Sequence, residues 1–177
     1  PLGELVDFIN KTHTVTSNPL LVPFWNRLQK PLSQIAQTTR FKFADIDGPS
    51  YYDPNSDTIV LRSNLNEGLP KCMSPMQVMV HEMVHALTVR KLALGKIQQH
   101  TELSRIYDEL DQLRRLAKKA AKNKRGVTLT YGLKSPEEFV AELLSGQKPF
   151  IEHLASVPYK NLGLENNVLH RLVHLVK

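Results

Sequence analysis

Apolar residues in the first forty positions recur at helical spacing in two stretches, residues 2–9 and residues 20–35. Apolar side chains three or four positions apart line one face of a helix and are typical of amphipathic helices. Pro23 and Pro31 interrupt the second stretch, so its helical pattern is less regular than that of the first. The pattern predicts a helical N-terminal extension over residues 1–40.

Two short strands are predicted after this extension. Residues 41–45 alternate apolar and polar side chains, and residues 58–62 are rich in β-branched side chains. A period of two is typical of strands with one buried face. The turn-forming residues at 47–49 and 51–55 predict that the chain reverses between them. We expect the two strands to form a hairpin or part of a small sheet.

A long apolar helix is predicted to begin at Ser74. This residue is a favourable N-cap, Pro75 suits the first helical position, and Gln77 completes a capping box. Because apolar residues surround most of the helix, we expect it to be buried at the centre of the domain and to end near Gly95. Its apolar positions are Met76, Val78, Met79, Val80, Met83, Val84, Ala86, Leu87 and Leu92.

The C-terminal half of the chain is predicted to be mostly helical. Residues 98–123 form an amphipathic pattern that Gly126 ends, and residues 127–131 are expected to be short and extended. Ser135 and Pro136 open another helix that continues to about residue 145, and residues 165–176 are helical again. The predicted class is therefore α+β, with a small sheet packed on the central helix.

The positive charge of the chain is concentrated in one segment. The 177 residues include 23 Lys and Arg against 17 Asp and Glu, a formal net charge of +6. Seven of the basic residues and no acidic one lie between Arg114 and Arg125, which leaves 16 basic against 17 acidic residues elsewhere. We assign this segment to a basic helical insertion at 96–126, within a single domain that spans residues 1–177.

Several classes of protein are excluded by composition. No apolar run approaches the roughly 18 residues that span a bilayer, and the N-terminus lacks the layout of a signal peptide. The single cysteine, Cys72, rules out a disulfide within the chain. We expect no membrane association and a cytoplasmic location. We also expect the sequence to be excised from a longer protein, which a virion could deliver or a cell could secrete as an effector.

The sequence HEMVH lies inside the predicted central helix and begins at His81. His81 and His85, four positions apart, share one helical face and can bind one Zn²⁺ at about 2.0–2.1 Å per nitrogen. The carboxylate of Glu82 stands beside them, where it can reach a water at the metal. The alternative is a helix with two histidines in the core and an exposed glutamate. We predict one zinc ion per chain.

A catalytic zinc needs a third protein ligand and an open position for water. One class of peptidase extends the motif as H-E-x-x-H-x-x-G-x-x-H. Thr88 and Lys91 stand where that pattern requires Gly and His, which excludes the class. His100 begins the following helix and has no partner signature around it. The third ligand is therefore sought among carboxylates on a later helix.

Spacing favours Glu138 as this carboxylate. Glu142 follows it by one helical turn, where a second carboxylate can hydrogen-bond the far nitrogen of a ligating histidine. Glu137 has no carboxylate at that offset. The alternative is that Glu138 completes a capping box by folding back on the amide of Ser135. We predict Glu138 as the ligand and Glu142 as its companion.

The two motifs together resemble those of gluzincin metallopeptidases. After HEMVH, residues 131–142 read YGLKSPEEFVAE. This combination resembles the catalytic domain of anthrax lethal factor and its relatives, and the short zinc-peptidase domains of large polyvalent phage proteins. The order of elements is similar over about residues 41–142, but individual residues match only in the two motifs.

The resemblance implies a zincin-like fold and a zinc-dependent metalloendopeptidase that cleaves a protein or peptide. In such enzymes the strand before the active helix is commonly the edge to which substrate adds, which implies residues 58–62 here; the alternative is an ordinary strand inside the sheet. The implied site residues are the ligands His81, His85 and Glu138, the general base Glu82, the hydroxyl of Tyr131 that steadies the transition state, and Glu142 behind the ligands.

Two other functions compete with this prediction. The domain could be a catalytically silent docking module in which zinc only stabilises the fold. The segment from Arg114 to Arg125 could bind nucleic acid or an acidic partner, although the usual explanation of such a run is a solvated helical face. His170 and His174 are also four positions apart, but no glutamate motif accompanies them, and we expect them to be surface or packing residues.

Overall fold

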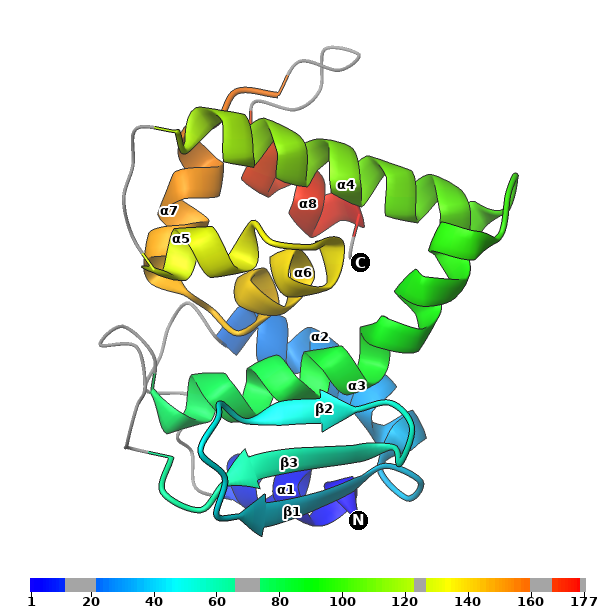
Figure 1. Ribbon diagram of the computed structural model, residues 1–177, viewed down its shortest axis with the longest axis vertical. Helices are drawn as coiled ribbons and strands as arrows, with labels where there is room; N and C mark the ends of the chain where they lie inside the picture. Colours follow the sequence, from blue (N-terminus) through cyan, green and yellow to red (C-terminus); the bar gives the residue numbers. More distant parts are fainter. Residues whose placement is uncertain (12–21, 66–73, 123–126, 160–166, 176–177) are drawn as a thin grey trace. The chain divides into compact units, whose positions relative to one another are not determined.

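The computed structural model describes five segments of the chain, and they form two compact units (Figure 1). The first unit contains residues 1–90 and 144–146, and the second contains residues 91–143 and 147–177. The class is α+β, because helices accompany one small three-stranded sheet. The described segments are residues 1–11, 22–65, 74–122, 127–159 and 167–175.

Helices α1 (Leu2–Lys11) and α2 (Val22–Ile35) confirm the predicted helices of the N-terminal segment. They pack against each other. The backbone N–H of Leu2 donates to the carbonyl of Thr39 at 2.8 Å, which ties the start of α1 to the residue before the sheet. The apolar faces of the two helices are buried through Leu2, Leu5, Ile9, Phe24, Trp25, Leu28 and Leu32.

The sheet contains strands β1 (Arg40–Ala44), β2 (Tyr51–Asp53) and β3 (Thr58–Arg62), in the order β1-β3-β2. The two predicted strands exist, but the expected hairpin between them is wrong, since β1 and β3 pair in parallel. The segment 51–55 was expected to be only a turn, yet its first three residues form β2, antiparallel to β3. Tyr52 lies opposite Ile59 and both are buried, so burial outweighs the turn pattern here.

Strand β3 is the central strand, so the expectation that residues 58–62 form the open edge of a cleft is wrong. Both of its edges are paired, one with β1 and the other with β2. Its three middle residues, Ile59, Val60 and Leu61, are buried, as expected for a strand covered on both faces. A further strand can therefore not add to β3.

Helix α3 (Pro75–Ile97) begins as predicted. The N–H of Gln77 donates to Ser74 Oγ at 3.3 Å, and the N–H of Ser74 donates to Gln77 Oε1 at 3.0 Å, which completes the capping box. The helix does not stop at Gly95 but continues to Ile97. A Cβ at Gly95 would lie 2.6 Å from the carbonyl oxygen of Leu103, so glycine permits a close backbone approach there.

The second unit is built from helices. Thr101 caps α4 (Glu102–Ala120) with a capping box that it shares with Ser104. Helix α4 packs on α8 (Val168–Leu175), and an ion pair between Glu109 and Arg171 joins these two helices. The predicted helix at 165–176 is thus confirmed over its central part. The predicted break at Gly126 and the single cysteine, Cys72, lie outside the described residues.

Residues 127–131 were predicted to be extended, and this is wrong, because they belong to helix α5 (Val127–Gly132). The Val and Thr residues of this segment favour strands, but packing of α5 against α7 (Lys148–Ser156) decides its conformation. A Cβ at Gly132 would lie 2.7 Å from the ring of Phe150. Glycine therefore lets the end of α5 approach its neighbours closely.

Helix α6 (Pro136–Leu144) confirms the helix predicted to open at Ser135 and Pro136. Ser135 Oγ accepts a hydrogen bond from the N–H of Glu138 at 3.3 Å and so caps the helix. Among all the described helices, none combines the length and apolar character that crossing a bilayer requires.

One side chain near the start of β3 organises the end of the sheet. Asp57 has a φ of 49°, and its carboxylate accepts hydrogen bonds from the Tyr52 hydroxyl at 2.7 Å and the Thr39 hydroxyl at 3.2 Å. Burial, and then the hydrogen bond to Asp57, raise the pKa of Tyr52 to about 12. The Tyr52 hydroxyl therefore remains a donor throughout the neutral range.

We predict that Asp57→Ala lowers the free energy of unfolding by about 1–3 kcal/mol, because two buried donors lose their acceptor and alanine is strained at positive φ. Asp57→Asn should lose less, since asparagine keeps an oxygen acceptor and tolerates the left-handed region. Urea unfolding followed by circular dichroism measures both. Equal losses in the two variants would contradict this account.

Candidate metal centre

His81 and His85 lie one turn apart on α3, and both are buried, with relative exposures of 2% and 8%. Their Nε2 atoms are 3.0 Å apart, and their rings meet edge to face at 76°. The spacing of four residues produces this arrangement, since it places both imidazoles on the same helical face. The Nε2 atoms of the two histidines thus lie close enough together to bind one ion.

The separation of the two nitrogens fits a shared metal ion. Two nitrogens bound to one tetrahedral zinc at about 2.0–2.1 Å lie about 3.3 Å from each other, close to the 3.0 Å observed. A shared proton would also suit this distance. Imidazole nitrogen is a common ligand of divalent transition metals, so the donor chemistry agrees with the geometry.

A carboxylate from α6 joins the two histidines. Among the residues that the structure describes, ligand atoms of His81, His85 and Glu138 all lie within 4.8 Å of one another, and this group can bind a metal ion. The hydrogen bond to Ser135 Oγ engages the backbone N–H of Glu138, while a carboxylate oxygen of Glu138 is its ligand atom in the group. The alternative in the sequence concerned the Glu138 carboxylate and the amide of Ser135, whereas this hydrogen bond runs from the Glu138 N–H to the Ser135 hydroxyl.

The donor set suits a site with an open position. Two imidazoles and one carboxylate are the ligand types found at catalytic zinc sites, where the fourth position is left for water or substrate. Glu137 and His100, the other candidates for the third ligand, are not part of the group. His100 is exposed and has a φ of 62° in the bend before α4.

Glu142 lies one helical turn after Glu138 and is completely buried. Burial, and then the negative charge of Glu138, raise the pKa of Glu142 to about 8. The missing side chain of Gly132 makes room for it, since a Cβ there would lie 2.8 Å from Glu142 Cγ. A cation held by Glu138 would offset the repulsion between the two carboxylates and favour ionised Glu142.

The two residues predicted to carry out the chemistry are not part of the ligand group. Glu82 follows His81 on α3 and is buried, with a relative exposure of 5%. This differs from the exposed glutamate expected if the motif were only a structural helix. Tyr131 lies in helix α5 rather than in the extended segment expected. Its relative exposure is 40%.

Two contacts that support these elements were not predicted from the sequence, one made by Gln77 and one at Gly132. Gln77 uses both ends of its amide, because its Oε1 accepts from Ser74 and its Nε2 donates to the carbonyl of Gly146 at 3.0 Å. Gly132 admits the side chain of Glu142, as described above. The capping role of Gln77 follows from its spacing from Ser74, but its contact with Gly146 has no local signal, and that of Gly132 is only the glycine after Tyr131.

The second pair of histidines shows no further ligands. His170 and His174 are both exposed on α8, and within the described part of the chain they belong to no group of three potential ligands. This agrees with their expected role as surface residues.

Comparisons with protein-family models, with curated proteins and with solved structures found no match to this chain. Any functional conclusion therefore depends on the residues themselves.

We predict that the wild-type chain binds about one zinc ion and that Glu138→Ala weakens this binding at least tenfold, because it removes one of three ligands. Glu137→Ala is the matched control, since it removes a carboxylate from the same turn of α6 and should leave binding unchanged. Metal content after dialysis and competition titration with a chelator measure both variants. Equal losses from Glu137→Ala and Glu138→Ala would contradict the assignment.

Proposed function

We propose that this chain is a zinc-dependent metalloendopeptidase of the gluzincin type, which hydrolyses peptide bonds in a protein or peptide substrate. The observation that carries the proposal is the group formed by His81, His85 and Glu138. Its members come from two separate sequence motifs, and both motifs also supply a further residue with a chemical role, Glu82 and Tyr131. A metal site with only a structural role needs neither of these two residues.

Zinc, when bound, would act as a Lewis acid: it would lower the pKa of water toward neutral pH and polarise the scissile carbonyl. His81, His85 and Glu138 are the residues that would hold the ion. The zincin-like fold belongs to the same proposal, and the small sheet with an adjacent HExxH helix is compatible with it.

Glu82 is the proposed general base and acid. Its carboxylate accepts a proton from the attacking water as the water oxygen bonds to the carbonyl carbon. It then delivers that proton to the departing amine nitrogen as the carbon–nitrogen bond breaks. The burial of Glu82 supports this role, because a carboxylate shielded from solvent interacts more strongly with nearby charges than one in water does.

Tyr131 is the proposed donor to the developing oxyanion. As the carbonyl oxygen gains negative charge, a phenol hydroxyl beside it donates a hydrogen bond that is stronger in the transition state than in the substrate. The exposure of Tyr131 supports this role, since a substrate can reach its side chain. Glu142 is assigned to orienting a ligating imidazole by accepting a hydrogen bond from its far nitrogen.

We predict that Glu82→Gln lowers the rate of peptide cleavage at least about a thousandfold while zinc stays bound, because glutamine cannot accept and return the proton. Mass spectrometry of a complex peptide mixture incubated with each protein detects cleavage of any peptide present, so a single substrate does not have to be chosen. Metal content serves as the control. Cleavage that survives the substitution would contradict the mechanism, and absence of cleavage by the wild type would favour the silent docking module.

For Tyr131→Phe we expect kcat to fall by about a hundredfold or more, with zinc content unchanged, because one oxyanion donor is lost. KM should change little, since the bond forms mainly in the transition state. Tyr107→Phe, which removes a phenol hydroxyl from α4, is the matched control and should retain full activity. A rise in KM with unchanged kcat would instead assign Tyr131 to substrate binding.

A further inference from the structure

The basic segment of the second unit is the C-terminal part of α4. Leu110, Leu113 and Ala117 are buried on the inner face of this helix, which packs on α8. The outer face of its last turns carries exposed basic side chains. In the described part of the chain these are Arg115, Lys118, Lys119 and Lys122.

The two arginines in the described part of the segment, Arg114 and Arg115, both bind Asp111. Arg114 Nε donates to Asp111 Oδ1 at 2.9 Å, and its Nη1 donates to the carbonyl of Leu133 at 2.9 Å. Arg115 Nε donates to Asp111 Oδ2 at 2.7 Å. Burial alone would raise the pKa of Asp111, but the hydrogen bonds from both arginines outweigh it and hold that pKa below its usual value. Arg114 therefore serves the fold.

The lysines differ from the arginines. Within the described residues, no carboxylate lies at ion-pair distance from Lys118, Lys119 or Lys122. They follow one another along the last turn of α4 and the residues after it, so three uncompensated positive charges gather at one end of the helix.

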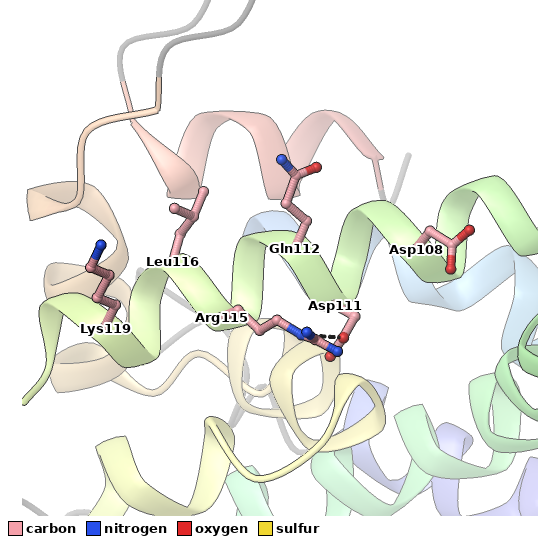
Figure 2. A pocket seen from close by; sticks show the side chains of 6 residues that line it. All are labelled: Asp108, Asp111, Gln112, Arg115, Leu116 and Lys119. Atoms are coloured by element: carbon pink, nitrogen blue, oxygen red, sulfur yellow. Dashed lines mark hydrogen bonds and ion pairs between the residues drawn. The ribbon is translucent and has the colours of Figure 1, made fainter.

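A hollow of about 450 Å³ lies beside these lysines, a size within the range of small-ligand sites. Leu116 gives it an apolar surface and Lys119 gives one end positive charge, whereas the charge of Arg115 is paired with Asp111. Figure 2 shows Arg115 joined to Asp111 by their ion pair, with Asp108 at the far end of the hollow. The described lining residues are Asp108, Asp111, Gln112, Arg115, Leu116 and Lys119.

We propose that the end of this hollow lined by Leu116 and Lys119, together with Lys118 and Lys122, forms a docking surface for a short acidic segment of a partner protein. Carboxylates of that segment meet Lys118, Lys119 and Lys122, and a side chain between them rests on Leu116. The surface is independent of the metal centre, and its occupation needs no catalytic activity.

The distribution of charge favours an acidic peptide over nucleic acid. Among the described lining residues, the basic ones end at Arg115, and Asp108 and Asp111 continue the hollow toward the start of α4. A phosphate backbone that tracked the helix would meet these two carboxylates, whereas a short peptide that lies over Leu116, Lys119 and Lys122 ends before them. No aromatic side chain is among the described lining residues, so the hollow offers no stacking platform for bases.

The test is fluorescence polarisation of the full chain with a labelled peptide of about ten residues, rich in glutamate and with one central leucine, at about 50 mM salt. A triple variant should weaken binding at least tenfold; it combines Lys118→Gln, Lys119→Gln and Lys122→Gln. The matched control is a second triple variant, which changes the net charge equally at exposed lysines elsewhere and should weaken binding less than threefold. It combines Lys30→Gln, Lys42→Gln and Lys96→Gln.

NMR shift perturbation in the unaltered chain keeps the test independent of variant stability, and the peptide should perturb residues 112–122 first. Absence of binding, equal loss in the control variant, or perturbation at a different surface would overturn the proposal. A single-stranded oligonucleotide of equal charge that binds more tightly than the peptide at the same residues would also overturn it, in favour of nucleic acid.

Discussion

Burial of ionisable side chains on an apolar helix is the constraint on which this structure depends. His81, Glu82 and His85 lie inside α3 among Val80, Met83 and Val84. Placing imidazole and carboxylate groups in such surroundings costs free energy unless hydrogen bonds, charges or a metal compensate for it. The pair of Nε2 atoms 3.0 Å apart, together with the carboxylate of Glu138, forms a donor set that a divalent cation can satisfy. A metal would therefore stabilise the fold and supply the chemistry at the same time.

Close approaches between elements support this arrangement. A side chain at Gly132 would collide with Glu142 and Phe150, so the end of α5 and the companion carboxylate occupy their positions only because this residue is glycine. Gln77 contributes in another way, since one amide caps α3 and also binds the carbonyl of Gly146. These contacts involve neither the group of His81, His85 and Glu138 nor Glu82, yet they join parts of the helices that carry these residues.

The excess positive charge has two different uses. Arg114 serves the fold, where its guanidinium joins Asp111 to the carbonyl of Leu133. A planar group with several donors suits such bridging, whereas a flexible ammonium group is readily left in solvent. Lys118, Lys119 and Lys122 follow this distinction, because they remain exposed beside the hollow on α4. Net charge alone could not have separated the structural cations from those available to a partner.

The sequence by itself determined the local features: the capping box at Ser74, the shared face of the two histidines, and the choice of Glu138, which the carboxylate one turn after it favoured. Each depends on residues three or four positions apart, which helical geometry brings together. Only the tertiary structure decided that β3 is central, that residues 127–131 are helical, and that Gly95 lies within α3. These outcomes depend on partners distant in the chain, whose packing energy outweighs local propensity and leaves no periodic signal in the sequence.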